Sequence, residues 1–466
     1  MSRPFPRTMP FTGNYAPILM ECDAYDLPVE GELPAGLHGT LLRNGANPQF
    51  APRDPGYHWF LGDGMVHAFN IADGRVTYRN RWVRTPKWEL EHAAGEALFG
   101  SWGNPRTTDP RALGKDGGVA NTSLVWHGGR LFALEEGHQP FELAPDTLKS
   151  LGYHDFAGKI TGNFTAHPRI DPEPGEMLFF AYSADGMLTP GIVYGVISPS
   201  GEVTRKELFQ APFCAMVHDF AVTRNHVLFP VLPLTGSLDR AMSGGPVFAW
   251  EPDKGAWIGI MRRDAGPGSL RWFRGDPCFV FHLMNAWEEG EQICAEVVRY
   301  DRPPYFPDTQ GTPGPAGVGR LARWRFDLSQ PGDGFAWDFI DDMQSEFPRI
   351  DERFTGLPYR HGWLACERPE GRTDAAGGLE HIDVKSGERT VFWMPQGDSV
   401  SEPVFVPRTA DAAEGDGWLL AVAWRGAERR SDLIVLDADA LADGPVATVA
   451  LSHRVPFGFH GTWRPG

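Results

Sequence analysis

The sequence of 466 residues contains no long apolar run and no cluster of basic residues. No window approaches the ~18 apolar residues that a membrane-spanning helix requires. Acidic side chains number 60 against 43 lysines and arginines, which gives a formal net charge of -17 at pH 7. The lack of such a window predicts no transmembrane segment. Because a negative surface repels phosphate groups and anionic lipid headgroups, we also expect no nucleic-acid partner.

Cysteine is also sparse. The 5 cysteines are widely spaced and form no C-x-x-C pair. This pattern supports neither a disulfide framework nor a zinc–thiolate site, and it is typical of reduced thiols. Residues 1–17 contain four prolines and two arginines and lack the unbroken apolar stretch of a signal peptide. We therefore expect a cytoplasmic protein.

Helical periodicity is scarce, and short strands dominate the pattern. Segments 91–100 and 236–244 are the best helix candidates. Elsewhere, runs of about four to eight residues rich in Val, Ile, Phe, Trp and Tyr recur between turn residues. A long chain of such strands must hide its sheet edges, and radial repetition of small sheets does so. We predict an all-β fold, a β-propeller forming a single domain over residues 1–466, with a pair of large sandwiches as the alternative.

Four of the 15 histidines share one setting, beside bulky apolar residues at the end of an expected strand. They are His167 in FTAHPRI, His218 in AMVHDFAV, His282 in CFVFHLMNAW and His460 in FGFHGTW. Inner strands of a propeller face one axis, so residues far apart in sequence can converge. Four neutral imidazoles suit a borderline divalent metal such as Fe, Zn, Cu or Ni. For each histidine taken alone, a structural role is the alternative.

Three glutamates adjoin apolar strand ends and are candidates to orient those rings. They are Glu136 in ALEEGHQPFEL, Glu346 in SEFPRID and Glu402 in SEPVFVP. A carboxylate that accepts a hydrogen bond from one ring nitrogen fixes the tautomer that offers the other nitrogen to a metal. The alternative for each is an exposed side chain at a turn.

Several longer stretches carry a family resemblance. They are LRNGANP, WFLGDGMVHAF, VANTSL, GNFTAHPRID, VHDFAVTRN, FHLMNAWEEG, SEFPRIDERF, SEPVFVPR and FHGTW, and they span residues 42–463. With them the sequence resembles the carotenoid cleavage oxygenases. The stretches VANTSL, RWVRTPKWELE and LFGSWGNP are most similar to the bacterial branch that acts on lignostilbenes and isoeugenol-like phenols.

This resemblance implies a seven-bladed β-propeller with a dome of loops and helices over a central iron site. It implies Fe(II) held by the four histidines. It further implies that Glu136, Glu346 and Glu402 orient His218, His282 and His460. Thr122 in ANTS would lie beside the vacant iron position and bias where O2 and water sit.

The implied reaction is scission of one C=C bond by O2 to two carbonyl products. No dinucleotide fingerprint, flavin motif or reductase domain is visible, and a lone GDG is a weak signal. We expect an aromatic alkene as substrate, a stilbenoid or a phenylpropenoid such as isoeugenol or 4-vinylguaiacol, and no reductase partner. One alternative is an apocarotenoid or carotenoid substrate. Another is a non-catalytic propeller scaffold with a structural zinc ion.

The expected substrate contacts depart from the family pattern at two positions. Stilbene-cleaving relatives use a tyrosine and a lysine to grip a phenolic hydroxyl, and the matching residues here are Trp102 and Glu135. A carboxylate repels a phenolate but can accept a hydrogen bond from a neutral phenol; alternatively, Glu135 points to solvent. Trp59, Phe281 and Phe306 complete an expected aromatic lining, with core packing as their alternative role.

Overall fold

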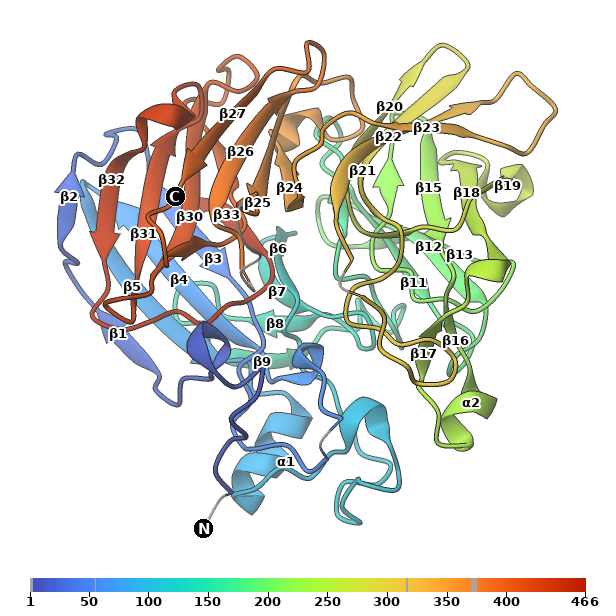
Figure 1. The fold of residues 1–466 in the computed structure, drawn as a ribbon, viewed down its shortest axis with the longest axis horizontal. Coiled ribbons are helices and arrows are strands. Elements are labelled where there is room, and N and C mark those ends of the chain that lie inside the picture. The colour runs from blue at the N-terminus through green and yellow to red at the C-terminus, as the bar shows by residue number, and fades with distance from the viewer. Residues whose placement is uncertain (1–2, 55, 316, 370–374) are drawn as a thin grey trace. The chain divides into compact units, whose positions relative to one another are not determined.

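The computed structural model describes residues 3–54, 56–315, 317–369 and 375–466, and these residues form mostly antiparallel β-sheet (Figure 1). Within them lie seven sheets of four to six strands and one two-stranded sheet. The seven larger sheets are the blades of a β-propeller, which confirms the predicted fold class and excludes the sandwich alternative.

The chain divides into two compact units, of which the first comprises residues 1–161, 392–412 and 416–466. The single domain over 1–466 stays a prediction. Three blades belong to the first unit. One contains β1 (Cys22–Ala24), β5 (Arg75–Trp82), β4 (Met65–Ala72), β3 (Gly39–Arg43) and β33 (Gly461–Pro465). The next contains β6 (Ser123–His127), β7 (Arg130–Leu134), β8 (Phe141–Leu143) and β9 (Ser150–Tyr153). The third contains β2 (Val29–Gly31), β32 (Pro445–Ala450), β31 (Arg430–Asp437), β30 (Gly417–Arg425), β28 (Ser399–Val400) and β29 (Val404–Pro407).

The second unit comprises residues 162–391 and 413–415. Its first blade contains β10 (Arg169–Ile170), β11 (Met177–Tyr182), β12 (Gly191–Ile197) and β13 (Val203–Gln210). Its second contains β14 (Ala221–Val222), β15 (His226–Val231), β18 (Ala256–Arg262) and β19 (Arg271–Gly275). Its third contains β20 (Phe279–Glu289), β21 (Gln292–Tyr300), β22 (Arg320–Asp327) and β23 (Ala336–Phe339). The fourth contains β24 (Ser345–Ile350), β25 (His361–Cys366), β26 (Gly378–Asp383) and β27 (Arg389–Trp393), and the two-stranded sheet is β16 (Leu234–Gly236) with β17 (Phe248–Trp250).

The strand sequences match their places in the blades. The middle strand β12, GIVYGVI, is buried along its whole length, whereas the edge strand β13, VTRKELFQ, alternates buried and exposed side chains. Charged residues on an edge strand discourage pairing with other chains. In the first unit, Leu41, Phe69 and Leu433 belong to one buried core cluster. Each such buried side chain contributes about 1.5–3 kcal/mol through the hydrophobic effect.

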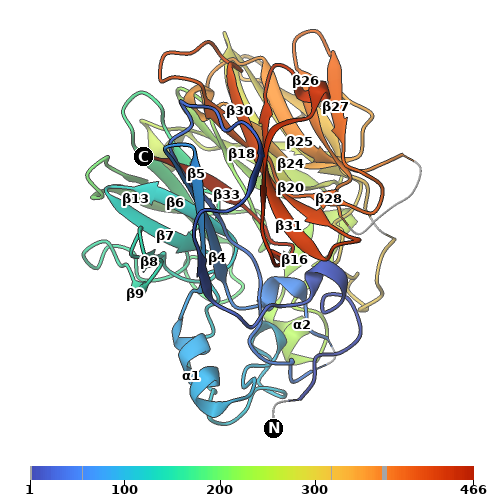
Figure 2. The same cartoon turned by 90° about the vertical axis from the view of Figure 1, so that its left-hand side faces the viewer.

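The two ends of the chain share one blade of the first unit. Strand β33, labelled in Figure 2, pairs antiparallel with β3 so that Trp463 faces Leu41 and Gly461 faces Arg43. The backbones come close just before this pairing, because a Cβ on Gly45 would lie 2.5 Å from the Cα of Gly458. Glycine is therefore required where the chain approaches His460.

Helices are few and short. They are α1 (Pro86–Ala94), α2 (Leu238–Met242) and the 3-10 segments η1 (Gly13–Tyr15), η2 (Trp59–Leu61), η3 (Ser101–Gly103), η4 (Pro252–Lys254), η5 (Gly266–Ser269), η6 (Glu352–Phe354) and η7 (Leu441–Asp443). The helix expected at 236–244 is present as α2. The helix expected at 91–100 is wrong in its bounds. The Thr85 side chain caps α1 at Trp88, Pro86 starts the first turn, and Gly95 ends the helix with φ of +70°.

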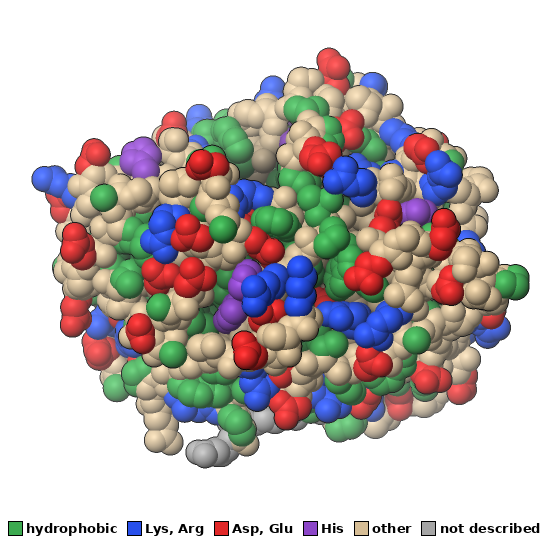
Figure 3. Space-filling view, turned by 90° about the horizontal axis from the view of Figure 1, so that it is seen from above, with side chains coloured by type: hydrophobic (Ala, Val, Ile, Leu, Met, Phe, Trp, Pro, Cys, Tyr) green, Lys and Arg blue, Asp and Glu red, His purple; other side chains and the backbone are tan. Residues whose placement is uncertain are grey.

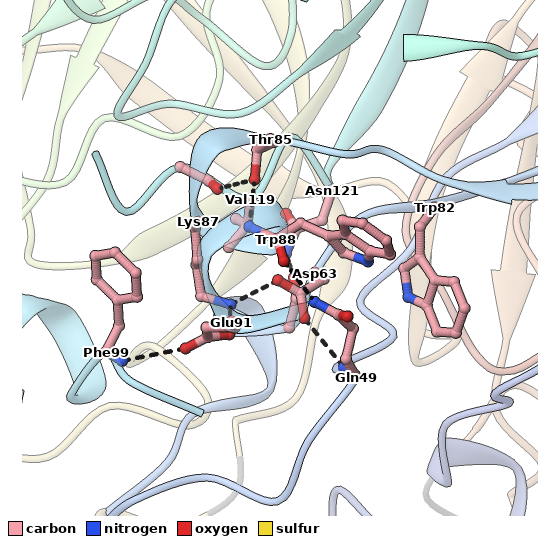
Figure 4. Close-up of polar contacts among 12 residues, drawn as sticks. Gln49, Asp63, Trp82, Thr85, Lys87, Trp88, Glu91, Phe99, Val119 and Asn121 are labelled. Atoms are coloured by element: carbon pink, nitrogen blue, oxygen red, sulfur yellow. Dashed lines mark hydrogen bonds and ion pairs between the residues drawn. The ribbon is translucent and has the colours of Figure 1, made fainter. Parts of the chain in front are cut away.

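A buried ion triad fixes α1 within the first unit (Figure 4). Lys87 Nζ lies 2.6 Å from Asp63 Oδ1 and 3.0 Å from Glu91 Oε2. The other oxygen of Glu91 accepts hydrogen bonds from the backbone N–H groups of Leu98 and Phe99. Burial alone would lower the pKa of Lys87, but the two carboxylates raise it, so the ammonium stays charged. The triad thereby holds the segment that leads to Trp102.

Acidic and basic side chains are interspersed on the face seen in Figure 3. Among the described residues, no helix has the length and apolar character needed to cross a bilayer.

Candidate metal centre

Three of the predicted histidine ligands converge in the second unit. The Nε2 atom of His218 lies 3.1 Å from Nε2 of His167 and 3.3 Å from Nε2 of His282. Metal–imidazole bonds of about 2.1 Å, 90–110° apart, place two nitrogens about 3.0–3.4 Å from each other. The spacing of these three ring nitrogens therefore suits a single divalent ion.

The histidines occupy places where a blade's first strand begins. His167 lies two residues before β10, and His218 lies three residues before β14. The backbone N–H of His167 donates to Thr165 Oγ1 at 2.9 Å, which fixes the turn ahead of the strand. These side chains project from backbone that is not yet committed to a ladder, so their direction is not dictated by strand alternation.

His282 and Glu346 both lie at irregularities in their strands. The pairing of β20 with β21 slips between Val280 and Leu283, around His282. The pairing of β24 with β25 slips after Glu346, where Phe347 has φ of +53°. Bulges of this kind re-aim side chains and are enriched beside active sites.

The bulges bring the two side chains into contact. His282 Nδ1 lies 2.6 Å from Glu346 Oε2, while Tyr300 donates its hydroxyl to Glu346 Oε1 at 3.0 Å. Burial alone would raise the pKa of Glu346, but His282, the Phe347 N–H and Tyr300 lower it below its usual range. The ionised carboxylate accepts the Nδ1 proton of His282, which leaves its Nε2 lone pair directed at the other two imidazoles.

His460 has an equivalent arrangement in the first unit. Its Nδ1 lies 2.9 Å from Glu402 Oε1, and Glu402 Oε2 accepts a hydrogen bond from the Gly461 N–H at 2.7 Å. The His460 backbone N–H donates to the Thr122 carbonyl at 3.1 Å, and its carbonyl accepts from the Asn44 N–H at 2.9 Å. Both the ring and the backbone of this buried histidine are therefore fixed by named partners.

Thr122 has an oriented hydroxyl. It donates to Asn121 Oδ1 at 3.0 Å, because the Asn121 amide nitrogen is already committed to the carbonyls of Phe60 and Gly62 at 2.8 and 2.7 Å. The Asn121 oxygen can then act only as an acceptor. The Thr122 oxygen consequently keeps its lone pairs for other partners.

Glu135 does not point to solvent, contrary to one expectation. Its side chain is 13% exposed, and its Oε1 lies 2.9 Å from His138 Nδ1. The same oxygen accepts the N–H groups of Val119 and Ala120 at 2.8 and 3.3 Å. Burial alone would raise the pKa of Glu135, but His138 and the two N–H groups lower it.

His138 completes an ion pair with Glu135. Burial alone would lower its pKa, but Glu135 and Asp116 raise it to about 9. Glu135 is therefore a compensated charge and not a free anion.

Aromatic rings adjoin the predicted ligands in each unit. In the first unit the rings of Trp59 and Phe459 lie 4.6 Å apart, and Phe459 precedes His460. In the second unit Phe281 lies 5.3 Å from His218 and Phe347 stacks on His282 at 5.4 Å.

The other predicted contacts are placed as follows. Trp102 has φ of +53° and lies 5.5 Å from the His58 ring, in the first unit. Glu136 is half-buried and Phe306 is buried. The roles of the predicted ligands, carboxylates and substrate contacts stay predictions.

Sequence reasoning missed several neighbours of these groups. Phe347 and Phe459 each adjoin a predicted residue, so the sequence offered a signal for both. Tyr300 offered none, because 46 residues separate it from Glu346 and the two residues meet through the packing of two blades of the second unit.

A β-propeller whose imidazoles are held by carboxylates has a donor set that could hold a metal ion, and comparison with known proteins identifies the family. The model of the retinal pigment epithelial membrane protein family matches residues 15–465. The chain belongs to this family, that of the carotenoid oxygenases, as predicted.

Individual relatives cover nearly the whole chain. Isoeugenol monooxygenase from Pseudomonas putida is 38% identical, with 97% of each chain covered. Lignostilbene-alpha,beta-dioxygenase isozyme III from Sphingomonas paucimobilis is also 38% identical, with 98% of this chain and 97% of the relative covered. The crystal structure of Pseudomonas brassicacearum lignostilbene dioxygenase matches with a TM-score of 0.97 and 37% identity over 100% of both chains.

Proposed function

We propose that this protein is a non-haem Fe(II)-dependent dioxygenase that cleaves the C=C bond of an aromatic alkene. The substrate class is a stilbenoid or a phenylpropenoid such as isoeugenol or 4-vinylguaiacol. The observation that carries the proposal is the convergence of the three Nε2 atoms, in a chain similar throughout to isoeugenol- and lignostilbene-oxidising enzymes.

The proposed ligands are His167, His218, His282 and His460. The Nε2 atoms of His167, His218 and His282 are spaced by 3.1 and 3.3 Å, which supports a common metal, and His460, whose ring is held by Glu402, is the fourth proposed ligand. The donor set fits Fe(II), because neutral imidazoles suit borderline divalent ions. Bound Fe(II) would supply the activation of O2, while the protein supplies orientation and exclusion of water.

The other residues have distinct proposed roles. Glu346 and Glu402 hold the rings of His282 and His460, and Glu136 is proposed to hold that of His218. Thr122, with its hydroxyl turned toward Asn121, biases where O2 and water reside. Trp59, Trp102, Phe281 and Phe306 are proposed to line the substrate site.

Glu135 and His138 give the substrate site its proposed polar end. Together they present a compensated pair in place of a lysine charge. Such a pair exchanges hydrogen bonds with a neutral phenol and does not draw it into the phenolate form. We therefore propose that the phenol binds protonated.

The proposed reaction balances without external electrons. The σ and π bonds between the two alkene carbons and the O–O bond of one O2 are broken, and each carbon forms a C=O bond to one of the two oxygen atoms. Two carbonyl products result, so no reductase partner is required. A cytoplasmic location is part of the proposal.

The test is cleavage of a substrate panel by Fe(II)-loaded protein under air and under nitrogen. The panel is isoeugenol, 4-vinylguaiacol, resveratrol and an apocarotenal, with aldehydes identified by mass after reaction under 18O2. Aromatic aldehyde formed only with O2 supports the proposal. Cleavage of the apocarotenal alone would replace the substrate class. Absence of any product, with zinc as the only tightly bound metal, would favour a scaffold.

A further inference from the structure

A second set of contacts joins the chain segments that carry the three converging histidines. Arg169 Nη2 donates to both carboxylate oxygens of Asp219, at 2.8 and 2.7 Å. It also donates to the Leu283 carbonyl at 3.1 Å, while Arg169 Nε donates to the Phe220 carbonyl at 3.1 Å. One guanidinium therefore contacts two further segments of the second unit.

Asp219 closes the arrangement from the other side. Its Oδ2 accepts the Leu283 N–H at 2.8 Å, and its Oδ1 accepts the Phe220 N–H at 2.8 Å. The Asp219 side chain is 1% exposed, whereas that of Arg169 is 24% exposed. The buried carboxylate is therefore fully engaged with one cation and two backbone groups.

The residues that make these contacts are close in the chain to the three converging histidines. Arg169 follows His167 by two residues, Asp219 directly follows His218, and Leu283 directly follows His282. Each partner is thus a near neighbour of one converging imidazole. The Nε2 atoms are 3.1 and 3.3 Å apart, so a shift of one segment by a few tenths of an ångström moves this spacing away from that of two ligands on one ion.

A contribution to folding stability does not by itself account for the buried Arg169–Asp219 ion pair. Replacing a buried ion pair by apolar residues of similar volume is often neutral or stabilising, whereas its geometry can specify one arrangement of the chain. Here the geometry specifies the relative placement of the three segments that carry His167, His218 and His282.

We propose that Arg169 and Asp219 are positioning residues that set the spacing of His167, His218 and His282 and thereby the affinity for the metal. This inference rests on the proposed function, in which these histidines hold Fe(II). Neither residue touches the reacting atoms. Their effect is on the preorganisation of the ligands, as expected for groups that orient a metal site from outside it.

The principal test variant is Asp219→Asn. Both carboxylate oxygens of Asp219 accept hydrogen bonds, whereas an asparagine has an NH2 group in place of one of them. That NH2 group would face an N–H donor of Arg169, Phe220 or Leu283, so at least one contact becomes repulsive. A second variant, Arg169→Lys, keeps the charge at a half-buried position but loses the paired donation. If Asp219→Asn does not fold, Arg169→Lys keeps the proposal testable.

The matched control is Glu296→Gln. Glu296 is a fully buried carboxylate in the second unit that pairs with Arg323, whose side chain is 20% exposed. It lies on β21, and its side chain bonds Arg323 and Tyr359, which lie outside the three histidine segments. The Glu296→Gln variant measures how much the loss of a buried ion pair in this unit lowers stability.

The readouts are Fe(II) and Co(II) affinity by chelator competition, the Co(II) absorption spectrum and the thermal midpoint. We expect Asp219→Asn to lower metal affinity about 10–100-fold and to alter the Co(II) spectrum. Arg169→Lys should do so to a smaller extent. Glu296→Gln should lower the thermal midpoint while keeping the affinity and spectrum of the wild type.

Two results would overturn the inference. One is wild-type affinity and spectrum in both Asp219→Asn and Arg169→Lys. The other is an equal loss of affinity in Glu296→Gln at the same loss of thermal midpoint. If the wild-type protein itself binds neither Fe(II) nor Co(II), the proposed function fails, which is distinguishable from failure of the positioning role alone.

Discussion

Nδ1 of His282 lies 2.6 Å from Oε2 of Glu346, although 64 residues separate them in the chain. Each residue lies on the first strand of its blade, at a point where the ladder slips. The contact therefore depends on two local departures from regular pairing. Because the contact is part of the proposed metal site, changing either residue by mutation tests the metal-binding proposal.

His218→Ala should remove iron binding and activity while leaving the fold intact. His218 Nε2 is within 3.3 Å of the Nε2 atoms of both His167 and His282, so its loss opens the centre of the ligand set. The measurements are iron content after reconstitution, product formation and circular dichroism. His38→Ala, at an exposed histidine, is the control. Full iron content with retained activity would contradict the ligand assignment.

Glu346→Gln should lower metal affinity and kcat by about 10–100-fold. The amide keeps the shape of the side chain but is a weaker acceptor for the Nδ1 proton of His282 and must also accommodate Tyr300. Chelator competition and steady-state kinetics measure the two effects. Tyr300→Phe, which removes one donor but keeps the carboxylate, should show a smaller loss. Equal losses in the two variants would mean that packing and not charge orients the ring.

Glu135→Gln should reduce the preference for a phenol over its methyl ether by about tenfold, the magnitude expected for one hydrogen bond to a charged group. The change keeps the shape of a residue that bonds Val119 and Ala120. Glu135→Lys is less informative, because a lysine would face the same N–H groups and the charged His138. The assay compares kcat/KM for isoeugenol and its methyl ether. An unchanged ratio would place Glu135 outside the substrate site.

The His138–Glu135 pair should make stability depend on pH. The folded-state pKa of His138 is raised from 6.5 to about 9, so its contribution is fully present below pH 6.5 and is lost as the pH rises toward 9. Thermal unfolding of wild type and His138→Gln should differ most at pH 6 and least at pH 9. His38→Gln serves as the exposed control. A difference that stays constant between pH 6 and pH 9 would show that the pair does not titrate as described.

Lys87→Met should cost about 3–5 kcal/mol in unfolding free energy, because it leaves Asp63 and Glu91 as buried, uncompensated charges. Urea unfolding at pH 7 measures this loss. The triple change Lys87→Met, Asp63→Asn and Glu91→Gln should recover part of it. If the triple variant is no more stable than Lys87→Met, the loss comes from packing of the methylene chain and not from the stranded carboxylates.

The sequence allowed prediction of the blades and of the candidate ligands for physical reasons. Short apolar runs such as GIVYGVI are compatible with buried strands, and His167 and His218 stand two and three residues before the short strands β10 and β14. Glu346 and Glu402 adjoin strand ends in the same way. These patterns involve residues that are close together in the chain, so they can be recognised in a single sequence.

Other features depend on contacts that no local pattern encodes. The contact between Glu346 and Tyr300 follows from a slipped ladder, and the cluster of Arg169 and Asp219 joins segments 50 residues apart. The bounds of α1 were predictable in principle from Thr85 and Gly95. Glu135 could not be placed without its partner His138, because an acidic residue beside a turn is ordinarily exposed.

The closing pair of β3 and β33 has a consequence for synthesis of the protein. Residues 39–43 leave the ribosome long before their partners at 461–465 are made. Until those partners are made, the edge of β3 that pairs with β33 exposes unpaired N–H and C=O groups to other chains. His460 and the strand that seals this edge then arrive together, so the same few C-terminal residues end the exposure and deliver the final proposed ligand.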